Sequence, residues 1–187
     1  MKDKTALLII DMVKDNLDEN NNFPITTFAK KIIPSINRLI KEVRKSNGLI
    51  VFPTDSYTEK DFIFKGKMKP HSIRGTKGAE VTELLDMEKE DLWLPKPKFS
   101  AFFGTNLNQW LKERGVTRCA IAGIAAHFCV LTTAMDAICY DFKTIILKDC
   151  TAAFSESIHE KTIEIFTKNP LYPLFKIASA DELIQEL

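Results

Sequence analysis

Three side chains with complementary chemistry stand in this sequence at or just after the ends of apolar runs. They are the thiol of Cys129, the ammonium group of Lys96 and the carboxylate of Asp11. A cysteine at a turn into a helix is biased toward the thiolate, because free N–H groups and the helix dipole favour negative charge there. A nearby lysine would add positive charge, and an aspartate would exchange protons with the thiol. Brought together, the three residues would form a nucleophilic cysteine site.

Each of the three residues also has a plainer interpretation. An aspartate such as Asp11 that follows a strand is often only a turn residue. Lys96 stands in a Lys-Pro-Lys stretch that is compatible with ordinary surface, and Cys129 would serve equally as a small buried hydrophobe. Asp55 and Asp149 end two further apolar runs. Composition and periodicity alone do not choose among these interpretations.

The elements that would position these side chains alternate along the chain. Near-continuous apolar runs predict strands covered on both faces, as in parallel sheets. Helical spacing of apolar residues between the runs predicts right-handed crossovers and an α/β, doubly wound parallel sheet, which binds ligands at the carboxyl ends of its strands. The expected strands are residues 6–10, 49–52, 91–94, 119–122, 144–147 and, more weakly, 174–177; the expected helices are 32–43, 105–115 with Thr105 as N-cap, 129–140 and 155–168.

Composition and charge narrow the class of protein. The chain has 187 residues, for which a single domain over 1–187 is expected, and its 26 Lys+Arg against 25 Asp+Glu argue against a nucleic-acid binder. No apolar run has membrane-spanning length, and the run at 6–10 is too short for a signal peptide. The four cysteines form no Cys-x-x-Cys pair, and with no secretion signal we expect reduced thiols and a cytoplasmic protein. From the charge balance and the short apolar runs we expect neither a nucleic-acid nor a membrane partner.

Five segments, in this order and spacing, resemble the isochorismatase-like cysteine hydrolases, a superfamily that includes nicotinamidases, N-carbamoylsarcosine amidases and isochorismatases. They are Leu-Ile-Ile-Asp-Met at 8–12, His-Ser-Ile-Arg-Gly-Thr-Lys-Gly-Ala-Glu at 71–80, Lys-Pro-Lys-Phe-Ser-Ala-Phe-Phe-Gly-Thr-Asn-Leu at 96–107, Gly-Ile-Ala-Ala-His-Phe-Cys-Val at 123–130 and Thr-Ala-Met-Asp-Ala at 133–137. The resemblance implies a three-layer α/β/α fold with a six-stranded parallel sheet. It also implies a catalytic triad of Asp11, Lys96 and Cys129. The family lysine stands four residues before the serine of Ser-Ala-Phe, which selects Lys96 over Lys98.

The resemblance further implies an activity. Isochorismatases that cleave a vinyl ether lack the nucleophilic cysteine, so the presence of Cys129 favours hydrolysis of a C–N bond in a small amide or ureido compound. The reaction would pass through a thioester and release ammonia without a cofactor. The backbone N–H groups of Ala125 and Cys129 would form the oxyanion hole. The peptide bond between Ile124 and Ala125 would be cis, which directs the following N–H into the pocket. Relatives are commonly dimers or tetramers, so we expect a homo-oligomer. Large apolar residues near loops that would support it are Phe102, Phe103, Leu171 and Tyr172.

Several positions depart from the nicotinamidase pattern. Many nicotinamidases bind a metal through an Asp-x-His sequence and a later histidine, but here Tyr57 replaces the first histidine and only Asp55 and His71 remain. We therefore predict no metal site, and expect the pocket residues Asn16, Tyr57, His71 and Phe99 to contact substrate. A nicotinamidase proper and a non-catalytic small-molecule binder of the same fold stay open as alternatives.

The segment 55–78 leaves a strand's carboxyl end without clear periodicity, so we expect it to cover a site there. Its basic residues favour a solvated loop, and the alternative is a lid that attracts a carboxylate-bearing substrate. These residues are Lys60, Lys65, Lys67, Lys69, Arg74 and Lys77.

Overall fold

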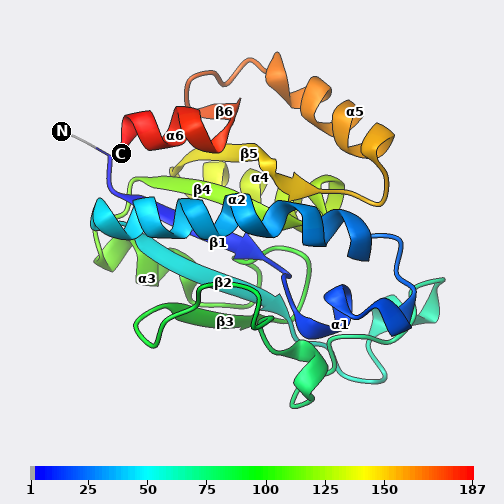
Figure 1. Ribbon diagram of the computed structural model, residues 1–187. Coiled ribbons are helices and arrows are strands. Elements are labelled where there is room, and N and C mark those ends of the chain that lie inside the picture. Colours follow the sequence, from blue (N-terminus) through cyan, green and yellow to red (C-terminus); the bar gives the residue numbers. More distant parts are fainter. Residues whose placement is uncertain (1–2) are drawn as a thin grey trace.

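The computed structural model describes residues 3–187 and is built around one six-stranded sheet in which every neighbouring pair of strands is parallel (Figure 1). The strand order is β3-β2-β1-β4-β5-β6. This order confirms the predicted doubly wound α/β fold. The strands are β1 (Thr5–Ile10), β2 (Leu49–Asp55), β3 (Leu92–Lys96), β4 (Arg118–Ile124), β5 (Lys143–Ala152) and β6 (Phe175–Ala178).

Helices cover both faces of the sheet, which gives three layers. The helices are α1 (Lys14–Leu17), α2 (Thr26–Lys45), α3 (Leu107–Glu113), α4 (Leu131–Cys139), α5 (Glu156–Thr167) and α6 (Ala180–Glu186). The long helix α2 crosses one face with α6 near its end, and α3 and α4 lie behind the sheet (Figure 1). Short 3₁₀ turns occur at Glu19–Asn21, Phe62–Lys65 and Lys77–Ala79, and a π-helical turn occupies Ala126–Val130.

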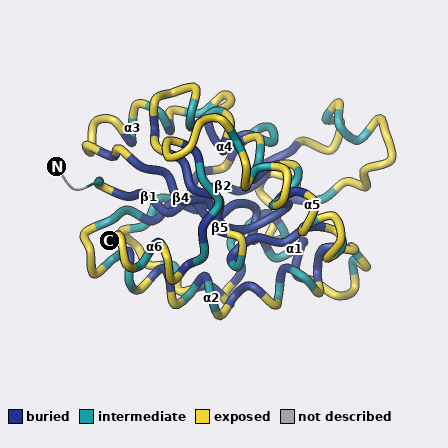
Figure 2. Tube along the Cα trace, turned by 90° about the horizontal axis from the view of Figure 1, so that it is seen from above, coloured by how far each residue is buried: buried dark blue, intermediate teal, exposed yellow. Residues whose placement is uncertain are grey.

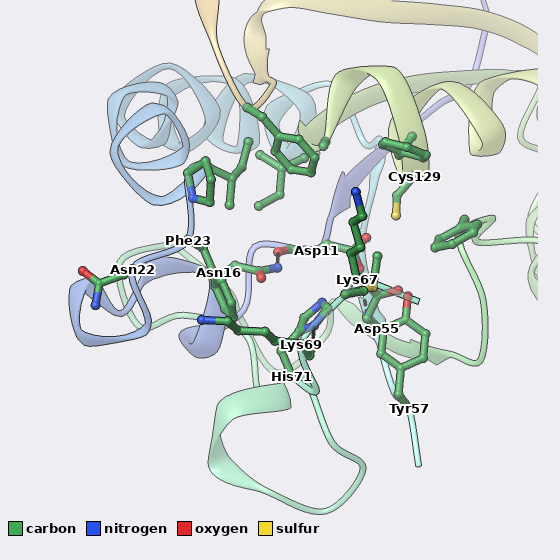
Figure 3. Close-up of a pocket in the computed structure, with 18 residues that line it drawn as sticks. Asp11, Asn16, Asn22, Phe23, Asp55, Tyr57, Lys67, Lys69, His71 and Cys129 are labelled. Atoms are coloured by element: carbon green, nitrogen blue, oxygen red, sulfur yellow. Dashed lines mark hydrogen bonds between the residues drawn. The ribbon is translucent and has the colours of Figure 1, made fainter. Parts of the chain in front are cut away.

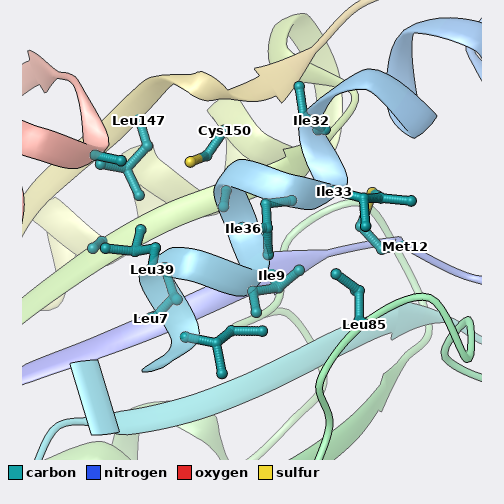
Figure 4. Packing of buried hydrophobic residues seen from close by; sticks show 14 of the residues in the cluster. Leu7, Ile9, Met12, Ile32, Ile33, Ile36, Leu39, Leu85, Leu147 and Cys150 are labelled. Atoms are coloured by element: carbon teal, nitrogen blue, oxygen red, sulfur yellow. The ribbon is translucent and has the colours of Figure 1, made fainter. Parts of the chain in front are cut away.

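The core consists of two apolar clusters, one on each face of the sheet. Successive side chains of a strand point to opposite faces, so Leu7 and Ile9 of β1 pack in the cluster under α2, whereas Leu8 and Ile10 pack in the cluster under α3 and α4. Figure 4 shows Ile36 and Leu39 of α2 in the first cluster. The buried trace runs through the centre of the molecule with exposed segments around it (Figure 2). Strands buried on both faces explain why the sequence reads as unbroken apolar runs.

Several element boundaries differ from the sequence-based expectation. Helix α2 starts at Thr26, earlier than the apolar pattern shows, and the Thr26 hydroxyl donates a hydrogen bond to the Asn16 carbonyl at 2.9 Å. Helix α3 begins at Leu107, so Thr105 is not its N-cap, although the Thr105 hydroxyl accepts a hydrogen bond from the Leu107 N–H at 3.3 Å. Helix α6 was not predicted, and a capping box between Ser179 and Glu182 starts it.

The apolar residues expected near an oligomer interface divide into two groups. Phe103, Leu171 and Tyr172 are exposed. Phe102 is buried, with its ring 5.4 Å from that of Tyr140 and a further contact to Phe142 in the core, so the expectation that it is available to a partner is wrong. Among the described helices, none combines the length and apolar character needed to cross a bilayer.

Candidate active site

The ammonium group of Lys96 is the centre of a buried ion cluster at the carboxyl ends of β1, β2 and β3. Its Nζ lies 3.0 Å from Oδ2 of Asp11, contacts the carboxylate of Asp55 and donates a hydrogen bond to the Lys98 carbonyl at 3.1 Å. Burial by itself lowers the pKa of Lys96, but the charges of Asp11 and Asp55 raise it above its ordinary value. A fully buried lysine is tolerated here because two carboxylates and a carbonyl oxygen surround it. Lys96 therefore remains a cation.

Asp11 is held at the end of β1 by hydrogen bonds at its Oδ1, its N–H and its carbonyl. Its Oδ1 accepts from the Asp55 N–H at 2.8 Å, its own N–H donates to the Pro53 carbonyl at 2.9 Å, and its carbonyl accepts from the Asn16 amide at 2.9 Å. Burial and the neighbouring charge of Asp55 raise the pKa of Asp11 to about 7, against the opposing effect of Lys96. A carboxyl group with this pKa gains and loses a proton near neutral pH, as a general acid–base residue must.

Cys129 lies beside this cluster, on the turn that follows β4. Strand β4 ends at Ile124, the Ile124–Ala125 peptide bond is cis, and the π-helical turn carries Cys129 before α4 begins. The ligand atoms of Cys129, Asp11 and Asp55, which are one sulfur and one oxygen from each carboxylate, all lie within 4.8 Å of one another. With Lys96 in contact with Asp11, the structure thus brings Asp11, Lys96 and Cys129 together, as the sequence analysis expects.

The protonation of the thiol differs from the expectation. Burial raises the pKa of Cys129 well above its ordinary value; Lys96 opposes this shift, and the two carboxylates add to it. The expected bias toward a thiolate is therefore contradicted, because burial, with the added charges of Asp11 and Asp55, outweighs the attraction of Lys96. The site holds a neutral thiol beside a carboxylate whose pKa allows it to take the proton.

A cavity of about 580 Å³ opens above the cluster (Figure 3). Asp11, Asp55, Ala125 and Cys129 line its base, and all four residues expected to contact substrate line it as well. Apart from Asn22, the other lining residues are apolar, including Ile124, or belong to the 55–78 segment, which covers the site as expected. The substrate candidates are Asn16, Tyr57, His71 and Phe99; the further apolar residues are Phe23, Pro24, Ile25, Phe128 and Phe154; the segment adds Lys67, Met68 and Lys69.

Three functional positions escaped the sequence analysis. Asp55 was considered as a residue at a strand end and as a remnant of a metal motif, but not as the ion-pair partner of Lys96, which lies opposite it in the register of β2 and β3. The position of Asp55 at a strand end indicated a place near the site, but its pairing with Lys96 could be inferred only once the order of the strands was known. The aromatic wall of Phe128 and Phe154 was also missed, because these residues lie on two different turns and meet only in the fold, with ring centroids 6.3 Å apart.

Lys98 does not belong to the ion cluster. Its Nζ lies 2.5 Å from Oδ1 of Asp61, in a pair that is partly exposed. Only the backbone of Lys98 enters the site, through the carbonyl that accepts from Lys96. The geometry therefore agrees with the selection of Lys96.

The residues that replace a nicotinamidase metal motif do not fit a divalent cation. Asp55 is already paired with the Lys96 ammonium. Nδ1 of His71 lies 2.9 Å from the Lys69 carbonyl oxygen and so donates to it, which leaves Nε2 as the one ring atom able to bind a metal, and burial raises the pKa of the Tyr57 phenol. Within residues 3–187, the potential ligands that gather in a group of three are Asp11, Asp55 and Cys129, without His71. Since Lys96 contacts both carboxylates of this group, a second cation there would be repelled.

Comparison with known proteins agrees with the fold and the motifs. Residues 5–173 match the family model described as the Isochorismatase domain. The chain belongs to the isochorismatase family. A probable inactive nicotinamidase of Arabidopsis thaliana is 31% identical to this family member over 85% of the chain and 86% of the relative.

Two solved structures extend the comparison of this isochorismatase-family chain. A pyrazinamidase of Pyrococcus horikoshii in complex with zinc superposes with a TM-score of 0.81 at 27% identity, covering 94% of this chain and 99% of that one. An N-carbamoylsarcosine amidase of Thermoplasma acidophilum superposes with a TM-score of 0.81 at 26% identity, covering 95% and 97%. Both likenesses span more than nine tenths of this chain.

Proposed function

We propose that this isochorismatase-family chain is a cysteine hydrolase that cleaves the C–N bond of a small amide or ureido compound. The observation that carries the proposal is the convergence of a thiol, a carboxyl group with a pKa near 7 and a buried ammonium at the base of one cavity. This set supplies a nucleophile, a base and a fixed cation. A solved relative is named for hydrolysis of a ureido compound, N-carbamoylsarcosine, which supports the same substrate class.

The first half of the proposed reaction forms a thioester. The Asp11 carboxylate accepts the thiol proton of Cys129 while the sulfur bonds to the carbonyl carbon. The resulting oxyanion is stabilised by the backbone N–H groups of Ala125 and Cys129, donors of a kind that contribute about 3–4 kcal/mol each in related chemistry. The oxyanion then collapses, the C–N bond breaks, and Asp11 returns its proton to the nitrogen, so that ammonia leaves. Lys96 stays protonated throughout and offsets the negative charge of the two aspartates.

The second half releases the acid product. Water attacks the thioester carbon and gives a proton to Asp11, which acts again as the base. The C–S bond breaks, and the proton passes from Asp11 to the sulfur. The site thereby returns to a neutral thiol and a carboxylate. Each step uses only side chains that line the cavity or contact it.

The test is an ammonia assay of the purified chain with a panel of small amides and ureido acids. We expect ammonia release by the wild type, its loss in Cys129→Ser, and a thioester that mass spectrometry detects after rapid acid quench. Absence of release across the panel, with ligands still binding in the cavity, would instead support a non-catalytic binder. That second candidate has one observation in its favour, namely a relative described as a probable inactive nicotinamidase.

A further inference from the structure

Two lysines of the 55–78 segment line the same cavity as Cys129. Lys67 and Lys69 belong to the lining, whereas Lys60, Lys65 and Lys77 do not. In Figure 3, Lys67 points toward the turn that carries Cys129, and Lys69 points to the side on which Asn22 lies. The positive charge is therefore presented to the cavity at two positions on different sides of its opening.

The ammonium groups of Lys67 and Lys69 form no ion pair with a carboxylate of residues 3–187. The anionic residues that line the cavity are Asp11 and Asp55, and both already contact Lys96. The cavity opening thus carries positive charge that the protein itself does not neutralise. Such a field raises the local concentration of anions.

The chain is anchored just after these two lysines. The His71 ring packs edge-on against the rings of Phe23 and Tyr57, with centroids 5.6 and 5.7 Å apart, and its Nδ1 donates to the Lys69 carbonyl. The next residue, Ser72, donates its N–H to Oδ2 of Asp15 at 2.7 Å. These contacts hold the chain just after the two lysines, so less conformational entropy is lost when the lysines bind a ligand.

The rest of the cavity wall suits the body of a small organic acid. Phe99, Phe128 and Phe154 form one side, with Phe128 having neighbouring centroids 6.2 and 6.3 Å away. The apolar wall suits the apolar part of a substrate, while Lys67 and Lys69 are exposed at the opening, where their positive charge attracts anions. A neutral amide would make no use of Lys67 or Lys69.

We propose that the site selects amides or ureido compounds that carry a carboxylate, with Lys67 and Lys69 as the carboxylate-binding residues and the scissile carbonyl at Cys129. This inference rests on the proposed function. It excludes a neutral heteroaromatic amide as the preferred substrate. It also changes the interpretation of the basic run in the sequence, since two of its six cations face the site instead of solvent alone.

The first test compares succinamate with its methyl ester, which differ by one charge. The wild type is expected to show a kcat/KM for the acid at least tenfold above that for the ester. In Lys67→Gln/Lys69→Gln this ratio should fall at least tenfold, equivalent to about 1.4 kcal/mol of binding energy. Lys60→Gln is the matched control, because it removes an exposed charge of the same segment that does not line the cavity, and its ratio should stay within twofold of the wild type.

A second test does not depend on turnover and so separates this inference from the proposed function. Dicarboxylates from succinate to suberate are titrated against the alkylation of Cys129 by iodoacetamide, with the exposed Cys139 as an internal reference. At least one dicarboxylate should protect Cys129 at a concentration tenfold lower than its diamide, and the double lysine variant should lose this preference. Protection by diamides and dicarboxylates alike, or an unchanged preference in the double variant, would overturn the inference even if ammonia release is observed.

Discussion

Asp55 lies opposite Lys96 in the parallel pairing of β2 and β3, and the two side chains meet in a buried ion pair beside Asp11. Residues paired across parallel strands point to the same face, so the register itself sets this contact. Asp55 contacts the cation and, through its N–H, the carboxylate of Asp11. Asp55 therefore positions both Lys96 and Asp11.

The activity of the wild type should fall as the pH drops through about 7. The mechanism needs Asp11 ionised, and burial with the charge of Asp55 raises its pKa to about 7. Because Asp11 and Cys129 interact, the measured value belongs to the pair. The check is a pH profile of kcat/KM between pH 5 and 9. Asp11→Asn should lower kcat/KM about 10²–10⁴-fold, the range for loss of a general acid–base group.

Asp11→Asn should also change stability in a pH-dependent way. The pKa of Asp11 is higher in the folded protein than in the unfolded chain, so its contribution to the free energy of unfolding declines as pH rises from about 4 to about 7. Asparagine does not titrate. The variant should therefore gain stability relative to the wild type between pH 4.5 and pH 8 in urea denaturation. A constant difference across that range would contradict the raised pKa.

Asp55→Asn should move the acid limb of the kcat/KM profile to lower pH. The charge of Asp55 is one cause of the raised pKa of Asp11, and the variant removes it. A purely structural role for Asp55 would lower kcat without moving this limb. The measurement is the same pH profile with Asp55→Asn and the wild type in parallel, and Asp61→Asn serves as the control outside the cluster.

Lys96→Met should abolish most turnover and destabilise the fold, whereas Lys98→Ala should be mild in both respects. Removing Lys96 leaves two buried carboxylates without their cation, a change that costs about 3–5 kcal/mol in comparable sites. Lys98 forms a partly exposed pair with Asp61, worth under about 1 kcal/mol. Urea denaturation and the ammonia assay give both quantities. Near-normal kcat in Lys96→Met would refute its role.

Dialysis against a strong chelator should leave the ammonia-releasing activity intact. The cation that Asp55 contacts is Lys96, and among residues 3–187 His71 does not belong to the group of potential ligands formed by Asp11, Asp55 and Cys129. The measurement is the activity before and after dialysis, followed by addition of zinc, iron or manganese. Loss on chelation with recovery on adding a metal would show that Asp55 and His71 bind a metal with ligands outside the cluster described above.

We also propose that the chain forms a homo-oligomer through exposed apolar residues. Phe103 and Tyr172 are 59% and 70% exposed, which favours their burial against a second copy. Light scattering at micromolar concentration should give a mass at least twice the 21.3 kDa of one chain. Tyr172→Glu should lower this mass, and a single-chain mass for the wild type would reject the proposal.

The sequence alone determined the strands and the identity of the three central residues. An inner strand covered on both faces must be mostly apolar, so the runs of β1, β2, β4 and β5 were visible without any knowledge of their partners, whereas the edge strands β3 and β6 are only partly buried. Asp11 directly follows β1, and Cys129 stands at the turn after β4. The resemblance selected Lys96 over Lys98 by a local spacing. All of these features depend on residues that are close together in the chain, so they can be recognised without knowledge of the fold.

Only the tertiary structure decided which residues share the site and how they ionise. The pairing of Asp55 with Lys96 follows from the strand order β3-β2-β1, which no local pattern specifies. Lys67 and Lys69, unlike the other cations of their segment, line the cavity. The sequence suggested a thiolate at Cys129, but burial beside two carboxylates raises its pKa instead. Desolvation and charge–charge interactions depend on distances between residues that are remote in the chain, and the fold alone sets those distances.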